Sequence, residues 1–146
     1  HVDPKDFARL MRALLEEFSA PLLVKLREQI TEQSSIVFRP LEAMLMPQPW
    51  HQGRVVMIGD AVHATTPHLA SGACIGIEDG LVLAECVGSD LPLAKALETF
   101  QSRRWERCRM VVENSLRLGE IEMTGGSKEE HAQIMRDSMM ALAQPI

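Results

Sequence analysis

The sequence predicts an α/β protein that is mostly helical and has only a few strands. Apolar residues at helical spacing fill most of the chain, an apolar run at residues 54–58 ends in Gly59-Asp60, and glycines recur every fourth residue from Gly72 to Gly80. The 146 residues are enough for a compact domain with its own core. We therefore expect helices packed around a small amount of sheet.

Charge and cysteine usage argue against several classes of function. The net charge of −5 gives no electrostatic reason to bind nucleic acid or an anionic membrane. Cys74, Cys86 and Cys108 form no CxxC pair, so neither a disulfide framework nor structural zinc is expected. No apolar run reaches the ~20 residues of a membrane helix, and no secretory signal is visible. We expect a cytoplasmic protein without a membrane span and without a nucleic-acid partner.

The N-terminal part of the chain predicts two helices followed by strands. A helix capped by Asp3 is expected over residues 3–15, and a second helix over residues 21–31. Residues 35–46 alternate loosely between apolar and polar and predict one or two strands broken at Pro40.

Further helices are expected over residues 72–87, from about residue 90 towards residue 119, and over residues 127–142. Ser89 or Asp90 can cap the second of these, with Pro92 in its first turn. Ser127 and Glu130 have the spacing of a capping box at the third. Four arginines interleaved with glutamates predict a solvated helix face: Arg103, Arg104, Arg107 and Arg109.

The centre of the chain holds the features that indicate a ligand site. The run 54–58 is typical of a buried central strand, and Gly59-Asp60 places a carboxylate where that strand ends, at the sheet edge where α/β folds bind ligands. A helix then begins near Ser71, and its unpaired N–H groups favour negative charge. One face of that helix is nearly bare, so we expect it to pack tightly against a sheet or a flat ligand; it consists of Gly72, Gly76, Gly80 and Ala84.

A longer motif covers the same stretch. The run GDAVHATTPHLASGACIGIEDG, residues 59–80, closely resembles the pattern GDAAHxxxPxxGxGxNxxxxD, the second FAD-binding motif of flavoprotein monooxygenases similar to para-hydroxybenzoate hydroxylase. The similarity extends from about residue 36 to residue 122. The resemblance implies part of a Rossmann-like, FAD/NAD(P)-binding fold of the aromatic hydroxylase type.

The resemblance also implies roles for individual residues. Asp60 would accept hydrogen bonds from the ribityl chain of FAD, with Gly59 giving room, and Pro67 would lie beside the isoalloxazine ring near the substrate. The pyrimidine edge of the flavin, negatively charged when reduced, would face three backbone N–H groups. These belong to Gly72, Ala73 and Cys74.

Two positions depart from the family pattern. Leu69, which we keep among the cofactor-binding residues, stands for the first glycine, so the loop there needs no positive φ or solves the requirement differently. Cys74 replaces the usual asparagine and its amide. The version LASGAC is more similar to salicylate and 3-hydroxybenzoate hydroxylases, which implies hydroxylation of a phenolic, aromatic substrate with NAD(P)H and O2.

The family's GxGxxG unit, which cradles the FAD pyrophosphate, does not occur in this sequence. We therefore expect a C-terminal fragment of a monooxygenase, inactive alone, that binds FAD weakly or not at all. Residues 1–46 would be a remnant of the substrate-binding layer, residues 47–123 the C-terminal part of the FAD-binding domain, and residues 124–146 a C-terminal helix.

Two other functions stay open. A non-enzymatic helical module that retains the motif would act by self-association as a homo-oligomer, through the apolar strand and the bare glycine face. A flavin-dependent reductase or halogenase would share the FAD motif.

The remaining polar residues of the motif are expected to be structural. His63 and His68 have no third ligand at suitable spacing, so no metal site is expected. His63 is expected to form a structural hydrogen bond, and Asp79 to hold the loop through backbone N–H groups. No residue is assigned as catalytic.

Overall fold

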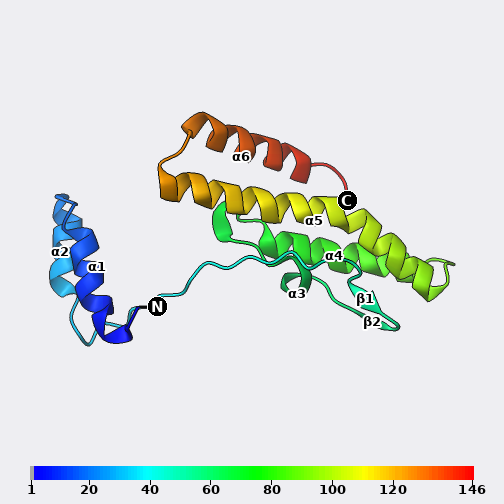
Figure 1. The fold of residues 1–146 in the computed structure, drawn as a ribbon, viewed down its shortest axis with the longest axis horizontal. Helices are drawn as coiled ribbons and strands as arrows, with labels where there is room; N and C mark the ends of the chain where they lie inside the picture. The colour runs from blue at the N-terminus through cyan, green and yellow to red at the C-terminus, as the bar shows by residue number, and fades with distance from the viewer. Residues whose placement is uncertain (1) are drawn as a thin grey trace. The chain divides into compact units, whose positions relative to one another are not determined.

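The computed structural model describes residues 2–146, which fall into two compact units, residues 2–40 and residues 41–146. Helices dominate both units, and the second also contains a short two-stranded sheet (Figure 1). The prediction of a mostly helical chain with little sheet is therefore confirmed. None of the helices in residues 2–146 combines the length and apolar character needed to cross a membrane.

The first unit contains two short helices, α1 (Phe7–Leu15) and α2 (Pro21–Gln29), and the 3-10 turn η1 (Pro4–Asp6). Asp3 caps η1 as expected, because its carboxylate accepts a hydrogen bond from the Lys5 backbone N–H at 3.0 Å. Both predicted helices are confirmed, with α2 ending two residues earlier than expected.

The strands predicted over residues 35–46 do not form in the described part of the chain. The backbone N–H groups of Met44 and Met46 instead donate to the carbonyls of Ala64 and Val62, at 2.8 and 2.7 Å. Because the partner segment includes a helical turn and not an extended strand, these alternating bonds do not continue into a ladder.

The second unit consists of a hairpin and a stack of helices. Its elements are β1 (His51–Gln52), β2 (Val55–Val56), α3 (Asp60–His63), η2 (Pro67–Leu69), α4 (Gly72–Val87), α5 (Leu93–Thr124) and α6 (Lys128–Leu142). The long helix α5 lies between α4 and α6 and contacts both (Figure 1). The core forms where α4, α5 and the Trp50 region meet, and fully buried Trp50 donates its indole N–H to the Met46 carbonyl at 2.9 Å.

The buried central strand predicted at residues 54–58 is not what this chain forms. Val55–Val56 pairs antiparallel with His51–Gln52 as one arm of a hairpin, and the side chains of Val55 and Ile58 are 68% and 37% exposed. A central strand is buried by neighbours on both edges and both faces. Within residues 2–146 the hairpin arm is its sole strand partner.

The helix boundaries follow local chemistry. The predicted helix over residues 72–87 is confirmed as α4. The Ser89 hydroxyl donates to the Cys86 carbonyl at 2.6 Å, at the end of α4, and Pro92 is the N-cap of α5, so the predicted Ser89 or Asp90 cap is wrong. Ser127 caps α6 as expected by accepting from the Glu130 N–H at 3.1 Å.

Candidate functional site

The Gly59-Asp60 turn is built on a conformation that favours glycine. Gly59 has φ 60° and ψ −141°, and its carbonyl accepts hydrogen bonds from the N–H groups of Val62 and His63, both at 3.0 Å. Asp60 is therefore the first residue of α3, and its side chain is exposed. The Asp60 carboxylate faces solvent, and within residues 2–146 it accepts no hydrogen bond.

This turn lies directly on α4. A Cβ atom added to Gly76 would be 3.6 Å from the Cα of Gly59, so the two backbones approach closely. Gly72 likewise faces the Thr65 side chain, whose Cγ2 would be 3.0 Å from an added Cβ. Gly80 meets nothing within 4 Å. The first two turns of the glycine face thus pack closely, but against the loop of residues 59–65 and not against the predicted sheet or flat ligand, and the third turn is open.

Asp79, a residue of α4, holds the Gly59-Asp60 turn against that helix. Its Oδ2 atom accepts hydrogen bonds from the Gly59 N–H at 2.8 Å and from Nε2 of His63 at 2.6 Å. Its Oδ1 atom accepts from Nε of Arg104 at 2.7 Å. The side chains of Asp79 and His63 are completely buried. The structure confirms the structural roles expected for both residues.

The charged forms of Asp79 and Arg104 stabilise each other. Burial alone would raise the pKa of Asp79, but hydrogen bonds from His63, the Gly59 N–H and Arg104 outweigh it and hold the pKa below its ordinary value. Burial likewise tends to lower the pKa of Arg104, and its pairing with Asp79 raises it instead. Burial, reinforced by the charge of Asp79, raises the pKa of Cys108 to about 12, so that thiol stays protonated.

Sequence reasoning missed Arg104. The four-arginine cluster was expected to be a solvated face, and this is wrong for Arg104, which is 1% exposed, and for half-buried Arg107, which clamps Glu78 with two bonds of 2.8 Å. The signal was present, because Arg104 lies midway between Phe100 and Cys108 on the buried stripe of α5 at helical spacing. Arg103 and Arg109 do form surface pairs with glutamates.

The first turn of α4 keeps its backbone donors free of a side-chain cap. The hydroxyl of Ser71 donates backwards to the Leu69 carbonyl at 2.8 Å, and no side chain caps the helix. The first hydrogen bond onto the Ser71 carbonyl comes from the Ile75 N–H at 3.0 Å. The amides of the predicted set Gly72, Ala73 and Cys74 precede it, and the side chains of Ala73 and Cys74 are exposed. This helix end carries partial positive charge.

The loop between the two features needs one correction. Pro67 is exposed at the start of η2, whereas the Leu69 side chain is 1% exposed and packs in the core. The positive φ falls on Ala70, at 51°, and Ala70 is also the residue that matches the first glycine when the pattern is counted from Gly59. Leu69 was assigned one position too early. The loop adopts the left-handed conformation with alanine, at a cost of ~1 kcal/mol or more.

His68 faces α5. Its Nδ1 atom lies 2.9 Å from the Thr66 hydroxyl, and its Nε2 atom lies 3.6 Å from Oε2 of Glu122. Only glycine fits beneath the ring, because a Cβ on Gly119 would be 2.6 Å from Cε1 of His68.

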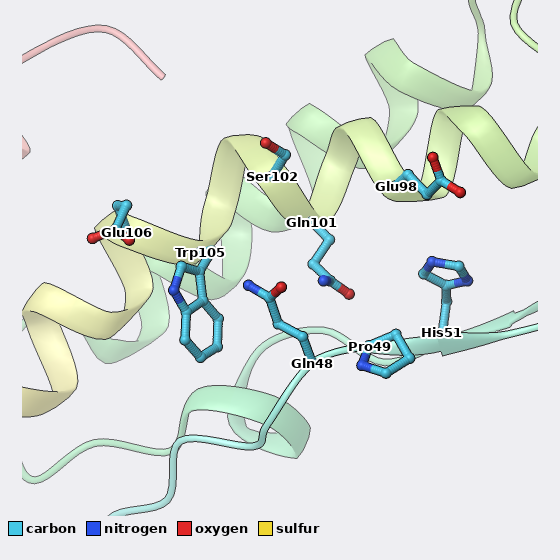
Figure 2. Close-up of a pocket in the computed structure, with 8 residues that line it drawn as sticks. All are labelled: Gln48, Pro49, His51, Glu98, Gln101, Ser102, Trp105 and Glu106. Carbon is cyan, nitrogen blue, oxygen red and sulfur yellow. The ribbon is translucent and has the colours of Figure 1, made fainter.

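Two other features could be mistaken for sites. Ligand atoms of His63, Asp79 and Cys108 lie within 4.8 Å of one another, but the Asp79 oxygens already accept from three nitrogen donors, and the protonated Cys108 thiol is itself a weak donor to Asp79. This geometry is that of an ion-pair network. A cleft of about 510 Å³ opens between the β1 region and α5, and none of the predicted site residues lines it (Figure 2).

Comparison with known proteins gives consistent matches. The family model described as "FAD binding domain" matches residues 13–115. The chain is 37% identical over 91 residues to aurachin C monooxygenase/isomerase of Stigmatella aurantiaca, which covers 62% of this chain and 24% of that protein. It is 41% identical over 75 residues to 3-hydroxybenzoate 6-hydroxylase of Polaromonas naphthalenivorans, which covers 49% of this chain and 18% of that protein.

A solved structure shares the fold. The chain resembles 2,6-dihydroxypyridine-3-hydroxylase of Arthrobacter nicotinovorans with a TM-score of 0.66 and 22% sequence identity, over 86% of this chain and 30% of that one. The matched region therefore spans less than a third of each of these three proteins.

Proposed function

The chain belongs to the FAD-binding-domain family, and we propose that it supplies one wall of the FAD site of an aromatic-ring monooxygenase. The observation that carries the proposal is that the two segments expected to bind FAD are held against each other. The Gly59-Asp60 turn and the start of α4 are held together by the close approach of Gly59 to Gly76 and by the bond from Gly59 to Asp79.

The residues present fit the cofactor. The exposed Asp60 carboxylate is a free acceptor of the kind that binds sugar-like hydroxyls, here those of the ribityl chain. The uncapped amides of Gly72, Ala73 and Cys74 suit the electron-rich pyrimidine edge of the flavin, and a helix N-terminus stabilises negative charge there by ~0.3–1 kcal/mol. When bound, FAD supplies the redox chemistry of the reaction.

The remaining predicted residues have more limited roles in this proposal. Pro67 presents an exposed ring face at the start of η2, beside the expected isoalloxazine position. Leu69 acts indirectly. Its buried side chain anchors the loop in the core, and its carbonyl accepts a hydrogen bond from the Ser71 hydroxyl. Catalytic side chains are left unassigned.

We propose that the rest of the FAD site lies in a longer polypeptide. The matched segment covers only 18–24% of the two curated relatives named above, and the GxGxxG unit is not in this sequence. The similarity to 3-hydroxybenzoate 6-hydroxylase favours a phenolic substrate. The motif resemblance adds NAD(P)H as co-substrate and O2 as oxidant to the proposal. Free Cys74, Cys86 and Cys108 fit a reducing, cytoplasmic setting.

A flavin titration tests this division of the site. The isolated 146-residue chain should bind FAD more weakly than ~1 μM, since half the contacts would be supplied elsewhere. Submicromolar affinity would overturn the shared site. Reading the coding sequence upstream of residue 1 is the matching genetic test, and a strand followed by GxGxxG is the expected result.

The exposed face of α4 favours a second candidate, a self-associating module. Ile77 and Leu81 on α4 are 67% and 55% exposed, and Val55 of the hairpin is 68% exposed. Exposed apolar patches of this kind promote association. Sedimentation of the isolated chain distinguishes the candidates when combined with the upstream sequence: a stable oligomer with a start codon immediately upstream favours the module.

A further inference from the structure

Arg104 is the charged centre of the buried network. Its side chain is 1% exposed and makes three directed contacts besides its weak contact with the Cys108 thiol. Nε donates to Oδ1 of Asp79 at 2.7 Å, Nη1 lies 2.9 Å from Oε2 of Glu78, and Nη2 donates to the Ile75 carbonyl at 3.2 Å. All three partners lie on α4, so a single guanidinium on α5 fixes one turn of the neighbouring helix.

The two carboxylate oxygens of Asp79 accept hydrogen bonds from different parts of the protein. Oδ1 faces Arg104, while Oδ2 faces the loop, where it accepts from the Gly59 N–H and from His63. Arg104 gives Asp79 one hydrogen bond, from Nε to Oδ1, while Nη1 and Nη2 are held by Glu78 and the Ile75 carbonyl. Because the planar guanidinium is held at three nitrogen atoms, it fixes the position of Oδ1 better than a point charge would. With Oδ1 fixed, the positions open to Oδ2, the acceptor for the Gly59 N–H, are restricted.

We propose that Arg104 is a positioning residue of the flavin site. Its guanidinium orients the Asp79 carboxylate, and that carboxylate holds the N–H group of Gly59. Asp60, the next residue, thereby keeps its place beside α4, where Gly59 closely approaches Gly76. The proposal rests on the proposed function only for the final link, from Asp60 to FAD; the link from Arg104 to Gly59 is a property of the protein alone.

Amide hydrogen exchange measures the first link without cofactor. In the wild-type chain the Gly59 amide should exchange at least ~10-fold more slowly than that of Gly53, a turn glycine with φ 59° and nothing near it, because a charge-assisted bond protects Gly59. Equal exchange at these two glycines would overturn the proposal before any substitution is made.

Substitutions then test the role of Arg104 itself. Arg104→Gln should speed Gly59 exchange by ~10-fold or more, and Arg104→Lys, which keeps the charge but not the planar fork, should lie between that variant and wild type. Arg103→Gln is the matched control, since its neighbouring guanidinium pairs with Glu85 at the surface. If Arg104→Gln does not fold, Arg104→Lys and the wild-type comparison still decide. Protection of Gly59 that is unchanged in Arg104→Lys and in any folded Arg104→Gln would contradict the role.

FAD affinity measures the second link. In a polypeptide that binds FAD and contains this chain, Arg104→Lys should weaken FAD binding several-fold, in parallel with its effect on Gly59 exchange, while Arg103→Gln should not. Faster Gly59 exchange with unchanged FAD affinity would remove Arg104 from the flavin site and count against Asp60 as a ligand. A change in neither quantity would refute the positioning role alone.

Discussion

The two faces of α4 differ in how completely residues 2–146 cover them. The face against α5 is buried and holds the apolar side chains of Ile75 and Val82 around the charged Asp79, whereas the opposite face carries Ile77 and Leu81, which are 67% and 55% exposed. A helix that is apolar on every side is normally covered on every side. Within the described residues, α4 therefore has one covered face ordered around a buried ion pair and one apolar face that is open.

We expect the greatest loss of stability when the buried Asp79 carboxylate is removed. Asp79→Ala would remove the buried partner of Arg104, leave that guanidinium only its pair with Glu78, and release Gly59 and His63, so we expect a loss of about 3 kcal/mol in the free energy of unfolding. Urea denaturation measures it. Glu85→Ala is the matched control, since it removes an exposed arginine–carboxylate pair of 2.8 Å, close to the 2.7 Å of the buried pair, and should cost less than ~1 kcal/mol. Similar losses in both variants would contradict the difference between the faces.

The pH dependence of stability should report the same carboxylate. Because the folded-state pKa of Asp79 is lowered, its contribution is present above its unfolded value of 3.8 and is lost as the pH falls through the lower folded value. The groups facing it are His63, Arg104 and Cys108. Unfolding curves between pH 7 and pH 2 should show the wild type losing its advantage over Asp79→Asn below about pH 4. An advantage that grows on acidification would reverse the sign we infer.

Two glycine substitutions distinguish a crowded position from an open one. Gly119→Ala would push a methyl group into the His68 ring, and we expect a net loss of ~1 kcal/mol even after the gain in helix propensity. Gly80→Ala meets open space and should gain up to ~1 kcal/mol. Thermal unfolding of both variants is the measurement. Equal shifts in Tm would mean that His68 does not occupy the position beside Gly119.

The smallest effect is expected on the exposed side. Ile77→Lys should change the stability of the monomer by less than ~0.5 kcal/mol, because that side chain touches little of this chain. Ile75 lies two residues earlier on α4 and is 1% exposed, so Ile75→Ala should lower the free energy of unfolding by ~2 kcal/mol or more. If Ile77→Lys also dissociates an oligomer seen by sedimentation, the apolar face is the self-association surface. A large loss in the monomer would show that the face is already covered.

Local features of the fold were predictable from sequence, and those that depend on distant neighbours were not. The bounds of α4 and the caps at Asp3 and Ser127 follow from nearby residues. The run at residues 54–58 has the composition of a central strand, but burial depends on strands that residues 2–146 do not supply. Intrinsic strand preference therefore predicted a central strand where the chain forms a short, exposed hairpin arm.

The candidate site shows the same limit. The motif predicted the structural roles of His63 and Asp79, because both residues and the Gly59 turn that they hold lie within the motif itself, residues 59–80. The partner of Asp79 lies on another helix, so Arg104 was assigned to the surface by its charge although its spacing fits the buried stripe. The positive φ at Ala70 was missed because alanine rarely adopts that conformation without neighbours that impose it.

We propose that one flavin contacts both Asp60 and the first turn of α4. An NMR titration of the ¹⁵N-labelled chain with millimolar FAD can detect this contact, since weak binding is sufficient for amide shifts. We expect concerted shifts at Asp60, Ala73 and Cys74 with one dissociation constant. Shifts confined to the Trp105 cleft of Figure 2, or none at Asp60 while α4 responds, would contradict it.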